Sequence, residues 1–125
     1  MSSEDNRDEK RYQALKSALA DIGYIRRGSL TRHFTRCGKL GCRCQATPPK
    51  LHGPYYDWTR KVSGKTVTQR LTPEEAEAFR EWNRNTRRFD SILVQMQRVS
   101  LRLTDRVLRQ LAKPPRRTRS NGVPL

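Results

Sequence analysis

Residues 55–75 read YYDWTRKVSGKTVTQRLTPEE, which predicts a β-hairpin that leads directly into a helix. With Ser63-Gly64 as a two-residue turn, one face of the hairpin collects the apolar side chains and the other pairs Asp57 with Arg70. A slip of one residue would exchange the two faces, so this register is strongly specified. The apolar face then carries Tyr56, Trp58, Val62, Val67 and Leu71.

A long helix is expected to begin at Thr72-Pro73, because Thr72 suits the N-cap, Pro73 the first turn, and Glu75 completes a capping box. The helical repeat continues to about Leu111, and most positions of a heptad series along it are apolar. We therefore expect a homodimer through the distal part of this helix. The alternative is a bent helix, or two helices, packed on the N-terminal helix within one monomer. The series is Phe79, Trp82, Thr86, Phe89, Leu93, Met96, Ser100, Leu103, Val107 and Gln110.

Upstream of the hairpin, residues 5–22 carry one apolar stripe at helical spacing, and Gly23 follows where a left-handed C-cap is expected. Residues 24–36 have strand composition, with Leu30 and Phe34 on one side of the pleat. The fold predicted is α+β: an N-terminal helix, a small antiparallel sheet of about three strands pinned by one zinc ion, and a long C-terminal helix.

All three cysteines and one of the two histidines lie in the short segment between the predicted strands, as Cys37, Cys42, Cys44 and His52. Three thiolates and one imidazole match a closed structural site, so we predict one Zn²⁺ bound by these side chains. Cys42 and Cys44 can share an ion only if the chain turns between them. His33 is the alternative fourth ligand, and three reduced cysteines without metal are the competing interpretation.

The chain carries 27 lysines and arginines against 12 acids, a net charge of +15, and 20 of the bases are arginine. Such a balance favours a polyanionic partner, because arginine forms forked contacts with phosphate. The alternative is a solvated basic surface with no such partner. The side chains predicted to hold phosphates are Arg26, Arg27, Arg32, Arg36, Lys39, Arg43, Lys50, Arg60, Lys61 and Arg70.

Apolar residues make up 34% of the 125 residues, too few to fill one large core without a metal, oligomerisation or local disorder. No apolar run is long enough for a membrane span, and the N-terminus does not resemble a secretory signal, so we expect a cytoplasmic protein. We divide the chain into an N-terminal helix (1–23), a zinc-stabilised β module (24–72), a long basic helix (73–112) and a disordered basic tail (113–125).

The segments GSLTRHFTRCGKLGCRC, HGPYYDW and GKT, followed by a helix that opens with Pro-Glu-Glu, resemble a widespread family of small bacterial and archaeal proteins of unassigned function. The resemblance covers roughly residues 28–95. Cys37, Cys42, Cys44 and His52 match the family's R-C-G-K-x-x-C-x-C and H-G-P-Y-Y segments. It implies a zinc-stabilised small domain whose relatives are often associated with mobile elements, and it implies no activity.

These observations predict a zinc-stabilised nucleic-acid-binding accessory protein of a mobile element or prophage, with DNA favoured over RNA. The alternative is a protein–protein interaction module, in which zinc folds a platform and the long helix dimerises. We expect no enzymatic activity, because four protein ligands leave zinc no open position. A catalytic zinc would become the better interpretation if His52 were not a ligand.

Overall fold

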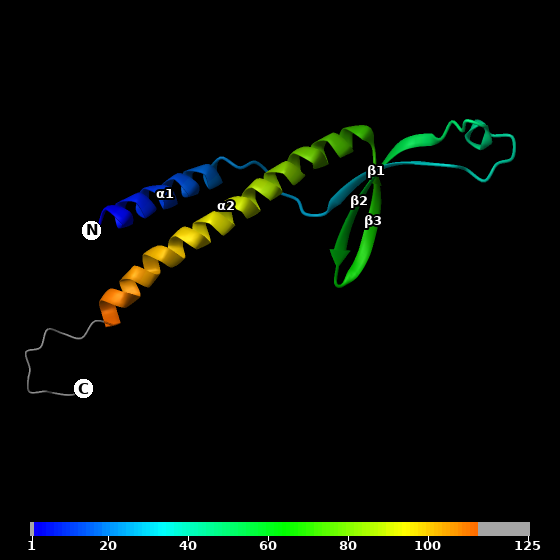
Figure 1. Ribbon diagram of the computed structural model, residues 1–125. Coiled ribbons are helices and arrows are strands. Elements are labelled where there is room, and N and C mark those ends of the chain that lie inside the picture. The colour runs from blue at the N-terminus through cyan, green and yellow to red at the C-terminus, as the bar shows by residue number, and fades with distance from the viewer. Residues whose placement is uncertain (1, 113–125) are drawn as a thin grey trace, which may run out of the picture. The chain divides into compact units, whose positions relative to one another are not determined.

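The computed structural model describes residues 2–112, and the tail predicted at residues 113–125 lies outside this part of the chain. The elements follow one another as α1 (Ser3–Ala20), β1 (Ser29–Thr35), the short 3-10 helix η1 (Arg43–Gln45), β2 (His52–Val62), β3 (Lys65–Leu71) and α2 (Pro73–Ala112) (Figure 1). The strands form one antiparallel sheet in the order β1-β2-β3. The predicted α+β architecture is thus confirmed.

The chain forms two compact units, and α2 contributes to both of them. One contains residues 22–90, with the sheet and the first half of α2. The other contains the described residues before 22 and after 90, which are α1 and the second half of α2. The four-segment division made from the sequence stays a prediction. No helix within residues 2–112 combines the length and apolar character needed to cross a membrane.

The hairpin of β2 and β3 has the predicted register, with Tyr56 opposite Leu71, Asp57 opposite Arg70 and Trp58 opposite Gln69. Ser63 and Gly64 form the turn with φ angles of 51° and 80°. Positive φ at both central residues is the type I′ geometry, whose twist matches that of the flanking strands.

The core of the first unit consists of Trp58, Leu71 and Phe79, and Trp58 and Phe79 lie 4.7 Å apart between ring centroids. Phe79 reaches this core because α2 starts immediately after β3. Its first turn has the predicted capping box: the Glu75 N–H donates to the Thr72 hydroxyl at 3.1 Å, and the Thr72 N–H donates to the Glu75 carboxylate at 2.8 Å.

Strand β1 covers the edge of β2 and departs in part from the prediction. Leu30 packs against the core as expected, whereas Phe34 is 45% exposed. The β1–β2 register shifts between His33 and Thr35. A register shift interrupts the alternation of faces, which a regular strand would have continued through Phe34.

In the second unit, Leu15 of α1 is buried, and Asp8 of α1 accepts hydrogen bonds from two side chains of α2, from Arg102 at 3.1 and 3.3 Å and from Arg106. The prediction of a left-handed C-cap at Gly23 was wrong. Helix α1 ends at Ala20, and its C-cap residue Asp21 keeps right-handed geometry with φ −87° and donates its N–H to the Ala18 carbonyl at 3.2 Å.

Candidate metal centre

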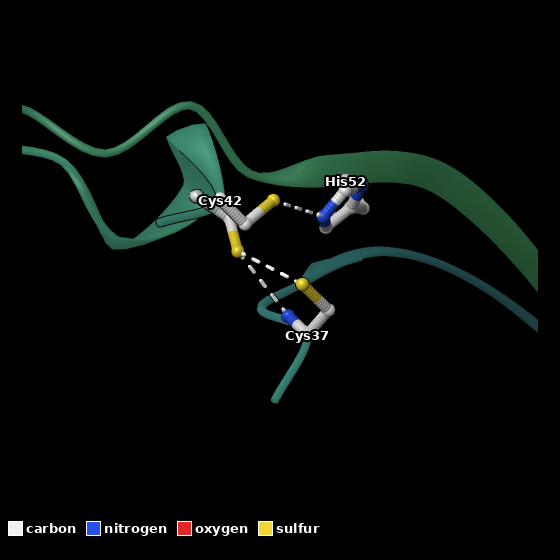
Figure 2. Close-up of side chains that lie close together, drawn as sticks. Cys37, Cys42 and His52 are labelled. Carbon is white, nitrogen blue, oxygen red and sulfur yellow. Dashed lines mark hydrogen bonds between the residues drawn. The ribbon is translucent and has the colours of Figure 1, made fainter. Parts of the chain in front are cut away.

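The pairing of β1 with β2 brings together the two ends of the segment between them, residues 36–51, which we call the cysteine loop. Thr35, the last residue of β1, lies opposite His52, the first residue of β2. Cys37 lies two residues after the end of β1, and Cys42 and Cys44 lie further along the loop between the strands. Residues 15 positions apart are therefore brought to one place by the sheet register (Figure 2).

The ligand atoms of Cys37, Cys42, Cys44 and His52 all lie within 4.8 Å of one another. The Cys37 and Cys44 sulfurs are 3.5 Å apart, and the Cys42 sulfur is 3.2 Å from Nε2 of His52. Figure 2 marks the contact between Cys42 and His52 with a dashed line. A tetrahedral zinc with Zn–S bonds of about 2.3 Å separates its sulfurs by roughly 3.8 Å. The spacing of these donors therefore fits one tetrahedral metal ion.

The chain turns between Cys42 and Cys44, as sharing an ion requires. Helix η1 begins after Cys42 and holds Cys44, which is fully buried, and the Gln45 N–H donates to the Cys42 carbonyl at 2.9 Å. Gly41, with φ 80°, allows the approach to this turn. Both thiols consequently point inward although one residue separates them.

Gln45 secures the loop, and its role was not predicted from the sequence. Its side-chain amide donates to the Cys37 carbonyl at 2.7 Å and also lies 3.8 Å from the Cys44 sulfur. An amide after the third cysteine has no signal of its own in the sequence, because its role depends on the turn that η1 makes.

The cluster favours a thiolate at Cys42. The backbone N–H of Cys44, and then the side chains of Cys37 and Cys44, lower the pKa of Cys42 to about 6. At Cys37 the backbone N–H of Lys39 lowers the pKa, but the neighbouring Cys42 and Cys44 thiols outweigh it and leave the pKa of Cys37 raised. Because the thiolate is the form that binds metal, the lowered pKa prepares Cys42 to bind a metal ion at neutral pH.

His33, the alternative ligand, is engaged elsewhere. Its Nε2 lies 2.6 Å from the Asp57 carboxylate, which also accepts a hydrogen bond from Nε of Arg70 at 2.9 Å. Arg70, and to a smaller extent His33, lower the pKa of Asp57. The imidazole that lies among the sulfurs is therefore that of His52, and His33 belongs to a polar network on the sheet. The sequence indicated the Asp57–Arg70 pair but not its contact with His33.

Four of the ten side chains predicted to hold phosphates lie over Trp58 or pair with an acidic side chain of the fold. The guanidinium groups of Arg26 and Arg60 lie over the Trp58 ring, at 4.3 and 3.7 Å from its centroid. Arg27 forms two 2.8 Å hydrogen bonds with Asp90, and Arg70 pairs with Asp57. These cations stabilise the domain, and any phosphate would compete with those contacts.

The other six are exposed, and none forms an ion pair within residues 2–112. Four of them surround the cysteines on the loop or next to it, and the remaining two lie on the strands. They are Arg36, Lys39, Arg43 and Lys50 around the loop, and Arg32 and Lys61 on β1 and β2.

Residues 5–81 match the model of a protein family described as a domain of unknown function, DUF6788. The match covers more than half of the chain, so the protein belongs to this family. It takes in most of α1, the sheet, the four clustered side chains that could hold a metal ion and the start of α2. A search of curated proteins finds no match, and a search of solved structures finds none either.

Proposed function

We propose that this member of the DUF6788 family binds one Zn²⁺ through Cys37, Cys42, Cys44 and His52, and that the folded loop helps it to bind nucleic acid. The observation that carries the proposal is the convergence of four soft and borderline donors within 4.8 Å. Sulfur and imidazole donors select zinc over magnesium or calcium, which prefer oxygen.

The role of the ion is structural. Four protein ligands complete a tetrahedral shell, which leaves no position for a reacting water. The loop has little else to hold it, since Leu40 is 98% exposed and Leu51 is 41% exposed. We therefore assign no enzymatic activity to this centre.

Nucleic acid is the partner that the charge of the loop favours. Arg36, Lys39, Arg43 and Lys50 flank the ligands, and three thiolates with one neutral imidazole on a dication offset only about one of these positive charges. We favour DNA over RNA, and we extend the proposal to an accessory role in a mobile element or prophage, which rests on the family resemblance alone.

Metal analysis of the purified protein tests the first half of the proposal. We expect about one zinc per chain, which the His52→Ala variant should lose in large part. His33→Ala is the matched control and should keep its zinc, because His33 contacts Asp57. The reverse result, with zinc lost from His33→Ala and kept in His52→Ala, would contradict the assignment of the fourth ligand.

A mobility-shift titration with duplex DNA at several salt concentrations tests the second half. Each phosphate contact contributes a slope of roughly −0.9 in log affinity against log salt, so binding should weaken steeply. Lys39→Gln with Arg43→Gln should reduce the affinity by about tenfold while zinc stays bound. Affinity that does not change with salt would exclude this mode of binding.

A second candidate is an interaction module that dimerises through α2. It is favoured by apolar side chains left exposed along the second half of the helix, including Leu101 at 55%, Leu108 at 61% and Leu111 at 76% exposed. Light scattering with and without DNA separates the two candidates. A dimer that forms without DNA and does not bind it would favour the interaction module.

A further inference from the structure

A cleft of about 730 Å³ lies within the unit of residues 22–90, between the first half of α2 and the segment that leads into β1. Most of the side chains that line it are polar or charged, and four are arginines from both walls. The lining consists of Arg27, Gly28, Ser29 and Leu30 on one side, and Arg80, Asn83, Arg84, Thr86, Arg87 and Asp90 on α2.

The charge of the cleft is strongly positive and only partly neutralised. Asp90 is the one acid in the lining, and Arg27 already engages both of its oxygens at 2.8 Å and lowers the pKa of its carboxyl group. Arg80 pairs with Glu77 outside the cleft. Arg84 and Arg87 are exposed and form no ion pair with any residue of the described chain.

The wall opposite α2 is held in place by hydrogen bonds to the helix and the sheet. The Arg26 N–H donates to the buried Thr86 hydroxyl at 2.9 Å, and Trp58 Nε1 donates to the Arg27 carbonyl at 3.0 Å. Gly28 has φ +129°, and a Cβ there would lie 2.1 Å from Trp58 Nε1. The cleft therefore exists before any ligand arrives, and binding does not have to order this wall.

We infer that this cleft is the main phosphate-binding site of the protein, and that the phosphodiester backbone of a nucleic acid lies along it with Arg84 and Arg87 as its principal contacts. The inference rests on the proposed function and names where it takes place. It places the principal contacts on two arginines of α2, which are not among the ten side chains predicted from the sequence to hold phosphates.

A polymer fits this site better than a free phosphate. The cleft is far larger than one phosphate group, and its arginines lie on two walls, so a single anion can reach only part of them. Arg84 and Arg87, three residues apart on the helix, share one face. Successive phosphates of a strand would use the arginines together, as guanidinium groups do when they position a backbone.

The test compares two double variants that remove the same charge from the same helix. Arg84→Gln with Arg87→Gln alters the cleft, whereas Arg88→Gln with Arg98→Gln removes two exposed arginines outside it. Each is titrated against a short duplex DNA at about 0.1 M salt and over a salt series. We expect the cleft variant to lose at least tenfold in affinity and to flatten the salt slope by about two contacts. The control should lose less than about threefold.

A third variant provides an effect that misfolding cannot imitate. Asp90→Asn releases Arg27 and removes the only negative charge of the lining, so DNA affinity should increase by about threefold.

Equal losses in both double variants would overturn the cleft as a site, as would displacement of the DNA by inorganic phosphate at matched ionic strength. If the unmodified protein binds no DNA at any salt concentration, the proposed function itself fails. A loss seen only in Lys39→Gln with Arg43→Gln would leave that function standing and refute the cleft.

Discussion

The cysteine loop and the β2–β3 hairpin are neighbours in the chain, yet they are held together by different means. In the hairpin, Trp58 and Leu71 are each 4% exposed and pack against α2. In residues 36–51 only Cys44 is buried, and the apolar Leu40 is 98% exposed. The hairpin thus has a hydrophobic core, whereas the loop has no such core and instead carries four side chains that could hold a metal ion. We therefore expect one part of this domain to depend on a bound metal ion and the other part to fold without it.

The largest effect should come from Cys44→Ser, which removes the buried ligand. Structural zinc contributes on the order of 10 kcal/mol in small fingers, so the loop should lose its order while the hairpin keeps its own. Hydrogen exchange should show protection lost in residues 36–51 and retained in residues 55–71. Leu40→Ala is the control, and it should change neither, because that side chain is exposed. Equal loss of protection in both segments would show that the hairpin also depends on the metal.

Trp58→Ala tests the hairpin rather than the cysteine loop, and it should destabilise the hairpin. Truncating a large buried aromatic side chain costs about 3–5 kcal/mol, because a cavity remains where its contacts were. Chemical denaturation measures this loss. Val62→Ala lies on the same face but is 46% exposed, and it should cost less than about 1 kcal/mol. Similar costs for the two variants would mean that the apolar cluster does not stabilise the domain.

Replacing one glycine that packs against the hairpin and one glycine in the cysteine loop compares how tightly the backbone is packed in the two regions. Gly28 packs against Trp58 with φ +129°, so Gly28→Ala should cost roughly 2 kcal/mol through strain and the clash with the indole ring. Gly38 lies in the loop with no atom within 4 Å of its Cβ position, so Gly38→Ala should change the melting temperature little. Thermal unfolding of both variants measures the two effects, and a larger decrease in melting temperature for Gly38→Ala than for Gly28→Ala would contradict this expectation.

The smallest effect should be the pH response of Asp57 on the polar face of the hairpin. Because Arg70 and His33 lower its pKa below 3.8, the folded protein favours the charged carboxylate more than the unfolded chain does. Its contribution to stability is therefore present above pH 3.8 and is lost as the pH falls through the lowered pKa. The difference in melting temperature between the natural protein and Asp57→Asn should shrink over that range. A difference that grows on acidification would contradict the direction of the pKa shift.

The sequence allowed the hairpin and the start of α2 to be predicted because local rules agreed there. Asp57–Arg70, the apolar face and the Ser63-Gly64 turn all require one register, and the Thr72–Glu75 box marks the helix start. The ligand set was predicted from the proximity and chemistry of its members. The structure brings those four side chains together, and the identity of the metal stays a prediction.

The features that were missed depend on contacts between distant segments. The end of α1 differs from the prediction because a glycine near a helix end permits a left-handed cap without requiring one. The cleft requires the segment that carries residues 27–30 to dock on α2, which it does through the hydrogen bond from the Arg26 N–H to the Thr86 hydroxyl group, sixty positions later in the chain. The spacing of apolar residues along the chain does not indicate such long-range docking. Arg60 was expected at phosphates and instead lies over Trp58, because its position on the strand faces the core side of the sheet.

The hydrogen bond from the Trp58 indole to the Arg27 carbonyl also gives the protein a built-in optical probe. The chain has two tryptophans, Trp58 and Trp82, and Arg27 lines the cleft. In a Trp82→Phe variant the emission would come from Trp58 alone, and its indole would sense any displacement of the adjacent wall. Stopped-flow fluorescence could then follow the arrival and departure of a ligand in real time, without an attached dye.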